Sequence, residues 1–399
     1  MTPLWISRFT ATSCIGRGLS ATLASLEDQH TGLTPCKFET VELDTYVGEV
    51  PDVDAARLPS GLAEFNCRNN RLAQLGLQQD GFAAAVEDLA GRVGRRRVGI
   101  FLGTSTSGML ETEIAYRHRD PATGSLPGNF HYREAHNTFS VADFARKALR
   151  LEGPAVVVSS ACSSSAKVFG SARRMMESGL IDAAVVGGVD SLCLTTLYGF
   201  HSLQLVSPSP CRPFDAARDG ISIGEAAAFA LLERPPSSLD PDAVLLLGIG
   251  ESSDAHHMSS PHPEGLGARA AMLQALSTAG LQPKDIDYIN LHGTGTPSND
   301  SAEAHAVTAV LGSDVPSSST KGATGHTLGA AGGLEAVICA LALQNGLMPA
   351  GLNTAAVDPA LNVNYLLENR RQKISRVMSN SFGFGGSNCS LILGRADFP

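Results

Sequence analysis

Short, continuous apolar runs are the feature that most restricts how this chain can fold. They alternate along the sequence with longer segments whose apolar residues recur at helical spacing. A strand that is apolar on both faces must be covered on both faces, as the strands of parallel α/β sheets are. We therefore expect a layered α/β protein built on the runs RVGIFLG (97–103), AVVVS (155–159), DAAVVGGV (182–189), AVLLLGIG (243–250), YINLHG (288–293) and CSLILG (389–394).

The composition excludes several other classes of protein. With 399 residues, 43% of them hydrophobic and 17% charged, the chain can bury a large core, as a soluble globular enzyme does. Its net charge of −9 argues against nucleic-acid binding, which needs a basic surface. The eight cysteines include no C-x-x-C pair, so we expect reduced thiols and neither a zinc site nor a disulfide framework.

The sequence gives no sign of a targeting or membrane segment. Its first residues, MTPLWISRFTATSCIG, lack the basic start and apolar core of a signal peptide. No apolar run reaches the roughly 18 residues that a membrane helix needs. We therefore expect a cytoplasmic protein with no membrane partner.

Three separated segments each place one reactive side chain among Gly, Ser and Thr residues, just after a strand-like run. They are SSACSSSAKVF around Cys162, NLHGTGTPSND around His292 and KGATGHTLGAAGG around His326. A cysteine at the start of a helix has its thiolate stabilised by the helix N-terminus, which makes it a usable nucleophile near neutral pH. Each segment alone could be structural, but one thiol with two imidazoles is suited to acyl transfer.

At these residues the chain resembles the elongating β-ketoacyl-acyl carrier protein synthases of the thiolase superfamily, which have a Cys-His-His triad. The resemblance extends to CRPFDAARDGISIGEAAAFALLE from Cys211, GIGESSDAHHMSSPHPEG from Gly248 and SNSFGFGGSNCSLIL from Ser379. It implies the thiolase fold, in which two similar α/β halves stack in five layers, α-β-α-β-α. We place the N-terminal half with the nucleophile at 1–236 and the C-terminal half with both histidines at 237–399, because the composition changes in the linker ERPPSSLDPD.

The resemblance also implies a reaction. An acyl group moves from an acyl carrier protein to Cys162, and a malonyl thioester then loses carbon dioxide to give an enolate that His292 and His326 stabilise. Attack on the acyl-cysteine gives a 3-oxoacyl product two carbons longer, in fatty-acid, aryl-polyene or polyketide synthesis. No metal and no cofactor is expected beyond the phosphopantetheine arm of the carrier. The oxyanion hole and a flexible gate are expected to consist of Cys162, Phe382, Gly383, Phe384 and Gly385.

Further residues take supporting roles by resemblance. Lys321 is expected beneath the site with Glu303 as its partner, because a buried ammonium needs a counter-charge. Asp300 and Glu335 are expected close by, although Lys321 and Glu335 could be purely structural. The expected ligands of the phosphopantetheine arm are Thr294 and Thr296.

The acyl tunnel and the carrier docking site are also assigned by resemblance. Thr106 falls where a residue closes the tunnel, so its small side chain predicts a longer tunnel, and Tyr132 falls where a second subunit supplies a wall. Arg68 and Arg71 lie three apart, on one face of an expected helix, and could dock an acidic carrier protein. They could equally be two solvated arginines.

Several alternatives remain open. We expect a homodimer, but the chain could be the ketosynthase subunit of a heterodimeric polyene or polyketide system. A non-catalytic chain length factor should lack Cys162. A thiolase should carry a further cysteine in a C-x-G-G turn, and a starter-unit synthase should have Asn in place of one His. A metal site at His256, His257 and His262 is disfavoured, because these residues lie in a loop without Cys or acidic ligands at suitable spacing.

Overall fold

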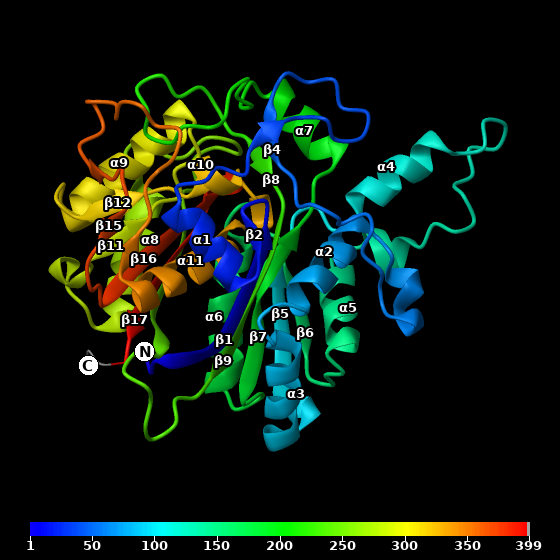
Figure 1. Cartoon of the computed structure of the whole chain (residues 1–399), viewed down its shortest axis with the longest axis horizontal. Helices are drawn as coiled ribbons and strands as arrows, with labels where there is room; N and C mark the ends of the chain where they lie inside the picture. The colour runs from blue at the N-terminus through cyan, green and yellow to red at the C-terminus, as the bar shows by residue number, and fades with distance from the viewer. Residues whose placement is uncertain (397–399) are drawn as a thin grey trace.

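In residues 1–396, which the computed structural model describes, the strands form two equivalent units (Figure 1). The N-terminal unit has the strand order β6-β5-β7-β9-β1. In this unit β5 pairs in parallel with β6 and β7, whereas β9 runs antiparallel to β7 and β1. Its strands are β1 (Leu4–Ser13), β5 (Val98–Gly103), β6 (Ala155–Val158), β7 (Ala183–Asp190) and β9 (Ala226–Glu233).

The C-terminal unit repeats this pattern strand for strand. Its order is β12-β11-β16-β17-β10, with β11 parallel to β12 and β16, and β17 antiparallel to β16 and β10. The two units meet where β1 pairs antiparallel with β10, from Leu4 opposite Leu246 to Ile6 opposite Val244. The strands are β10 (Val244–Ser253), β11 (Tyr288–Asn290), β12 (Pro316–Ser318), β16 (Arg376–Gly383) and β17 (Ser387–Arg395), with β14 (Asn364–Tyr365) beside β12.

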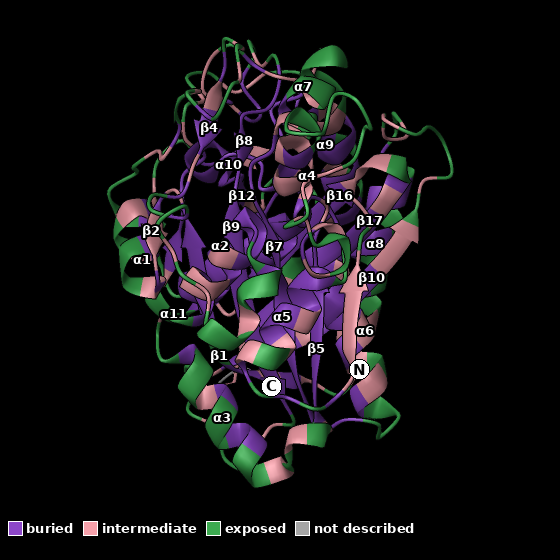
Figure 2. Cartoon of the chain, turned by 90° about the vertical axis from the view of Figure 1, so that its right-hand side faces the viewer, coloured by how far each residue is buried: buried purple, intermediate pink, exposed green. Residues whose placement is uncertain are grey.

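Two buried helices lie between the facing sides of the two sheets. Helix α6 (Ser164–Glu177) packs against β5 and β7, and helix α11 (Ala331–Asn345) packs against β16 and β9 as well as against α6. Small residues allow this close packing: a Cβ at Gly332 would lie 2.7 Å from the Cβ of Ala166. The remaining long helices cover the outer faces of the sheets, and Figure 2 shows their green, exposed sides around a purple interior.

These helices complete five layers. Helices α2 (Arg68–Leu77), α3 (Phe82–Val93) and α5 (Ser140–Ala148) cover the N-terminal sheet, while α8 (Leu266–Ala279) covers the C-terminal sheet and packs against α9 (Pro297–Leu311). The expected α-β-α-β-α arrangement of the thiolase fold is confirmed. The loop between Glu233 and Val244, at the expected domain boundary, connects the last strand of one unit to the first strand of the other.

One helical segment differs from what the sequence led us to expect. Leu328–Asn345 is long and apolar enough to cross a membrane by length and composition alone, although no such run was expected. In the structure 89% of this segment is buried inside the protein, because it lies between the two sheets. Its apolar character is therefore that of a core helix covered on all sides.

Shorter elements complete the fold. Helix α4 and the loop after it project from the body at the right of Figure 1. The short helices are α1 (Leu19–Glu27), α4 (Met109–Arg117), α7 (Leu194–Ser202) and α10 (Lys321–Thr324), with single turns at Ser60–Phe65, Arg95–Arg97, Tyr132–His136, Pro283–Asp285, Leu328–Ala330 and Phe384–Gly386. The short strands are β2 (Gly16–Arg17), β3 (Thr34–Pro35), β4 (Tyr46–Gly48), β8 (Ile223–Gly224), β13 (Leu347–Met348) and β15 (Arg370–Arg371).

Candidate active site

Cys162 lies in a sharp turn between β6 and α6. The residue before it, Ala161, has a φ of +52°, a left-handed conformation that costs a non-glycine residue about 1–2 kcal/mol. The turn is held by Ser164, whose hydroxyl accepts a hydrogen bond from the Ser160 amide at 2.9 Å and donates one to the Ala161 carbonyl at 2.5 Å. The thiol is thereby fixed at the start of the central helix, where it is only 5% exposed.

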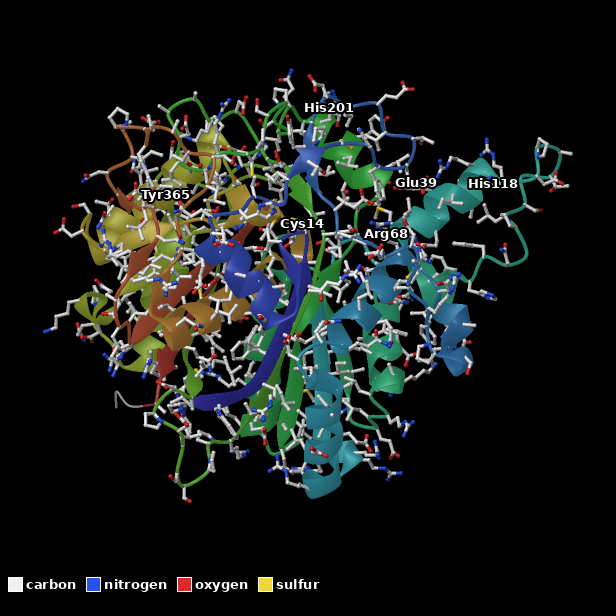
Figure 3. All side chains as sticks on the ribbon, viewed as in Figure 1. Cys14, Glu39, Arg68, His118, His201 and Tyr365 are labelled. Carbon is white, nitrogen blue, oxygen red and sulfur yellow. The ribbon has the colours of Figure 1, made fainter. Side chains whose placement is uncertain are left out.

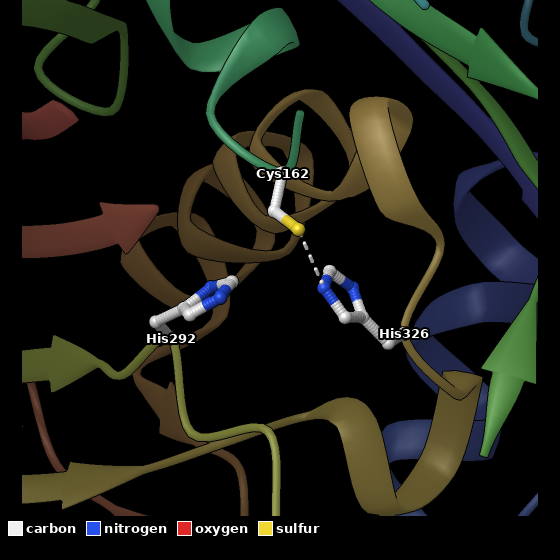
Figure 4. A group of neighbouring side chains, drawn as sticks. All are labelled: Cys162, His292 and His326. Carbon is white, nitrogen blue, oxygen red and sulfur yellow. Dashed lines mark hydrogen bonds between the residues drawn. The ribbon is translucent and has the colours of Figure 1, made fainter. Parts of the chain in front are cut away.

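His326 faces the sulfur of Cys162 directly, with 3.0 Å between Nε2 and Sγ (Figure 4). Its backbone is anchored on both sides to the β8 region, because its amide donates to the Ser222 carbonyl and its carbonyl accepts from the Gly224 amide. The Leu328 amide donates to Nδ1 at 3.3 Å. Since Nδ1 is an acceptor, the proton of the neutral ring lies on Nε2 and points at the sulfur.

His292 approaches the same point from the other sheet. Its ring lies edge-on to that of His326, with 5.3 Å between centroids and an interplanar angle of 83°. The Lys321 ammonium lies 3.3 Å from Nδ1 of His292 and 2.5 Å from its carbonyl oxygen. An ammonium only donates, so Nδ1 accepts and the second imidazole also carries its proton on Nε2.

The counter-charge of Lys321 is Glu335 on α11, to which its ammonium donates a hydrogen bond. Our expectation that Glu303 would be the partner is wrong. The carboxylate of Glu303 instead accepts hydrogen bonds from the amides of His292 and Gly293, at 2.8 and 2.7 Å. Those two amides and the side-chain amide of Asn380 satisfy Glu303, and Lys321 pairs with the carboxylate that faces it from the central helix.

Asp300 lies one helical turn before Glu303 on α9 and serves the same loop. Its Oδ1 accepts from the Thr294 amide at 3.0 Å, and its Oδ2 accepts from the Phe214 amide at 2.8 Å. The two carboxylates thus hold the segment that follows β11 through its backbone. Neither is a direct partner of the Cys162 sulfur.

The electrostatics of the site favour neutral imidazoles. Burial, together with the Lys321 ammonium, holds the pKa of His292 and His326 well below 6.5. Burial also raises the pKa of the Cys162 thiol to about 11, although Lys321 and the Phe384 amide lower it in part. In the resting site, loss of solvation therefore outweighs the stabilisation that the helix N-terminus was expected to give the thiolate.

The same side chains have the ligand types of a metal site. The sulfur of Cys162 and one nitrogen from each of His292 and His326 lie within 4.8 Å of one another. Metal binding would require an unprotonated nitrogen facing the centre. Because both Nδ1 atoms accept hydrogen bonds, both inward Nε2 atoms carry protons, and this donor set does not fit a metal.

A narrow cavity leads to the sulfur and is closed by the turn Phe384–Gly386. The Phe384 ring lies 5.5 Å from that of Phe200, and the Gly385 amide donates to the Met258 carbonyl at 2.8 Å. Gly385 has a φ of +78°, which glycine adopts without strain. Lining residues include Cys162, both histidines, Thr294, Thr296, Phe382, Gly383 and Phe384.

Sequence reasoning missed part of this gate. Asp254 accepts a hydrogen bond from Asn388 at 2.8 Å, and its amide donates to the Gly386 carbonyl at 2.9 Å. These contacts tie the loop 254–262 to the gate turn. The motif containing Asp254 was recognised as part of the resemblance, but no sequence signal placed Phe200 against Phe384.

Arg68 and Arg71 are not placed for docking. Arg68 is labelled in Figure 3. Its side chain is 1% exposed and is paired with Glu225 at 2.7 Å and with Asp54 at 2.7 Å. Arg71 is 14% exposed and is also paired with Asp54. The expectation of a carrier contact is wrong for Arg68, because its charge is neutralised inside the protein.

The two expected acyl-tunnel residues lie away from this cavity. Thr106 is 2% exposed, and its hydroxyl donates to Asp190 at 2.9 Å. Tyr132 is 59% exposed on the projecting arm, where its ring lies 5.1 Å from that of His136. Neither lines the cavity at Cys162 within this single chain.

Comparisons with known proteins identify the family. The model of the β-ketoacyl synthase N-terminal domain matches residues 72–237, and that of the C-terminal domain matches residues 243–355. Nodulation protein E of Rhizobium meliloti is 35% identical over 303 residues, which cover 74% of this chain and 75% of that protein. The chain belongs to the β-ketoacyl synthase family.

Other relatives of this chain are named as enzymes. The mitochondrial 3-oxoacyl-[acyl-carrier-protein] synthase of Arabidopsis thaliana is 40% identical over 60% of this chain and 56% of its own length. The 3-oxoacyl-[acyl-carrier-protein] synthase 2 of Coxiella burnetii is 38% identical over 61% of this chain and 63% of its own length. The aligned part thus spans less than two thirds of either relative.

Solved structures match over nearly the whole chain. A chain in the structure of the ketosynthase ApeO in complex with its chain length factor ApeC, from Xenorhabdus doucetiae, is 39% identical, with a TM-score of 0.88. That match covers 99% of this chain and 98% of the other. The ishigamide ketosynthase/chain length factor is 27% identical, covers 99% of both chains and has a TM-score of 0.88.

Proposed function

We propose that this β-ketoacyl synthase is a 3-oxoacyl-acyl carrier protein synthase that joins an acyl group to a malonyl unit with loss of carbon dioxide. The observation that carries the proposal is the convergence of Cys162 with two neutral imidazoles whose Nε2 protons point into one buried cavity. Such a site offers one nucleophile and two donors for a developing negative charge.

The first half-reaction transfers an acyl group from the carrier thioester to Cys162. The thiol must lose its proton as it attacks, and the leaving phosphopantetheine thiolate takes up one proton, so the step is neutral overall. The Nε2 proton of His326 stabilises the sulfur as negative charge develops on it. We assign the amides of Cys162 and Phe384, both of which lie within hydrogen-bond reach of the Cys162 sulfur, as the donors to the oxygen of the tetrahedral intermediate.

The second half-reaction forms the carbon–carbon bond. A malonyl thioester loses carbon dioxide, and the electron pair of the broken bond becomes an enolate whose oxygen needs donors. The Nε2 protons of His292 and His326, whose side chains are almost fully buried, supply them. The enolate carbon then attacks the acyl-cysteine and releases the sulfur as a thiolate, which takes up one proton from solvent to restore the resting thiol.

The approach to the site fits a long, thin substrate arm. Thr294 and Thr296 line the cavity, and the 2.9 Å hydrogen bond between their hydroxyls uses only one of the two O–H donors, which leaves the other for the phosphopantetheine arm. We assign the carrier-linked thioester to this cavity. No further cofactor is part of the proposal, and the cytoplasm, where carrier proteins and reduced thiols coexist, is the proposed location.

The pairing partner proposed for this chain is a related subunit. Support comes from the 39% identity with a chain of a ketosynthase and chain length factor complex, over nearly the whole length of both chains. Because Cys162 is present, this chain takes the ketosynthase role. Among the described residues the edge strand β6 pairs with β5 alone, and Tyr132 projects on the exposed arm, so both are placed to meet a second subunit. A homodimer is the second candidate assembly.

Intact-mass spectrometry tests the activity. The enzyme is incubated with a panel of acyl-carrier thioesters differing in length and unsaturation, and we expect the acyl mass to appear on the wild type but not on Cys162→Ala. Cys193→Ala is the matched control, because Cys193 is also buried but lies outside the cavity lining. Adding malonyl-carrier should release a 3-oxoacyl product. Acyl loading on Cys162→Ala would refute the proposal.

Light scattering tests the assembly. A homodimer gives a mass near twice 41.6 kDa. A chain that is inactive alone and becomes active with a chain length factor supports the heterodimer, and specific loading of polyunsaturated acyl chains would place it in polyene synthesis. A fully active monomer would refute both assemblies.

A further inference from the structure

Asp190 is a buried carboxylate at the end of β7 that the reaction does not use directly. It is 0% exposed, and hydrogen bonds from its neighbours stabilise its charge. Oδ1 accepts from the hydroxyl of Thr104 at 2.6 Å, from the amide of Ser105 at 2.7 Å, and from both the amide and the hydroxyl of Thr106 at 2.9 Å.

The second oxygen of Asp190 reaches across to the other half of the protein. Oδ2 accepts a hydrogen bond from the Gly329 amide at 2.5 Å. The approach is so close that a Cβ at Gly329 would lie 2.7 Å from this oxygen. The carboxylate therefore binds the N-terminal half with one oxygen and the segment that follows His326 with the other.

That segment is in a strained conformation. Leu328 has a φ of +51°, which costs a branched residue about 1–2 kcal/mol and persists only where the surroundings hold it. Its amide is the group that donates to Nδ1 of His326. Its N-terminal side is fixed because the His326 backbone is bonded to Ser222 and Gly224, and its C-terminal side is fixed by Asp190 at Gly329.

We propose that Asp190 is a positioning residue for His326. By holding Gly329, it keeps Leu328 in the conformation whose amide occupies Nδ1, and so keeps the imidazole proton on Nε2, facing Cys162. This rests on the proposed function only for its effect on the reaction, since the hydrogen bonds themselves do not depend on a substrate. Without this clamp, Nδ1 could carry the proton, and His326 would lose its donor toward the substrate.

The decisive variant is Asp190→Asn. The amide oxygen should take the Oδ1 position, where four donors converge, so its NH₂ group must face the Gly329 amide. Two donors then meet, and the Gly329 contact is lost while the shape is conserved. Thr104→Val is the matched control, because it removes one donor from Oδ1 and leaves Oδ2 with Gly329. Gly329→Ala breaks the same contact from the other side.

Nitrogen-15 NMR of histidine-labelled protein reads the tautomer directly. For wild type at pH 7.5 we expect His326, assigned with His326→Ala, to be neutral with its proton on Nε2. In Asp190→Asn or Gly329→Ala, whichever folds, the Nδ1-protonated form should appear, whereas Thr104→Val should keep the wild-type signals. A wild-type ring protonated on Nδ1, or variants with unchanged tautomers, would overturn the proposal.

Kinetics provide the second readout. We expect kcat for condensation to fall by about 10- to 100-fold in Asp190→Asn, because the Nε2–H donor of His326 is misplaced. The KM for malonyl-carrier should stay within about twofold of wild type, because no group that binds the carrier is changed. A kcat equal to that of Thr104→Val would overturn the proposal. If wild type fails to condense any thioester while the tautomer shifts as expected, the proposed function fails and the positioning role of Asp190 stands.

Discussion

Removing the ammonium of Lys321 should affect the stability of this protein and its proposed activity in ways that can be separated. Lys321 and Glu335 are paired with side-chain exposures of 1% and 3%. Breaking a buried pair by removing one partner typically costs about 3–5 kcal/mol, because the other charge is left without compensation. We therefore expect Lys321→Met to lower the free energy of unfolding by about that amount.

Removing both charges should restore stability. In Lys321→Met/Glu335→Met, two apolar side chains of similar volume meet, and the free energy of unfolding should return to within about 1–2 kcal/mol of wild type. Malonyl decarboxylation should not return. His292 lacks the donor at Nδ1 in both variants, and we expect a loss of about a hundredfold in each, the usual cost of one misplaced oxyanion donor.

The assay combines urea denaturation at one fixed protein concentration with release of carbon dioxide from malonyl-carrier. Lys321→Met/Glu303→Met is the control, and it should be no more stable than Lys321→Met, because Glu303 holds the amides of His292 and Gly293. The reasoning fails if Glu303→Met restores stability and Glu335→Met does not. It also fails if the double variant recovers decarboxylation.

Three further predictions follow from the site. His292→Ala and His326→Ala should each slow condensation by about a hundredfold, with a smaller effect on acyl transfer to Cys162, and equal loss of both half-reactions would point to misfolding. Both imidazoles have a pKa below 6.5 in the folded protein, so below about pH 6.5 the unfolded chain binds protons that the folded protein does not. The free energy of unfolding should therefore be highest above about pH 6.5 and decrease as the pH is lowered, which thermal unfolding at a series of pH values will show. Arg68→Met should cost about 3–5 kcal/mol by leaving Glu225 unpaired, with an unchanged KM for the carrier, whereas a raised KM at unchanged stability would support docking.

The sequence predicted the architecture well because its signals are local. Each continuous apolar run lies on a strand, from β5 at Val98–Gly103 to β17 at Ser387–Arg395, since a strand buried on both faces leaves no room for polar residues. The equivalence of the two halves was harder to recognise from the sequence. The two units share strand order and pairing, yet their side chains have diverged, so only the sheet topology shows the equivalence.

Predictions about charged partners succeeded less often, because sequence spacing does not fix which groups meet. Lys321 was expected to pair with Glu303, but the carboxylate of Glu303 accepts hydrogen bonds from the backbone amides that follow β11. Arg68 was expected to dock an acidic carrier protein or to be solvated, but Glu225 and Asp54 converge on it from elsewhere in the chain. Both outcomes depend on tertiary contacts.

The sequence by itself determined the layered α/β fold and the set of reactive residues, since apolar periodicity and the Cys162, His292 and His326 segments are readable one stretch at a time. Only the tertiary structure decided the chemical state of that set. Burial raises the thiol pKa to about 11 and keeps both imidazoles neutral, and the Lys321 ammonium and the Leu328 amide place their protons on the inward nitrogens. Solvation and hydrogen bonding are properties of the packed site, which brings together groups from both halves of the chain.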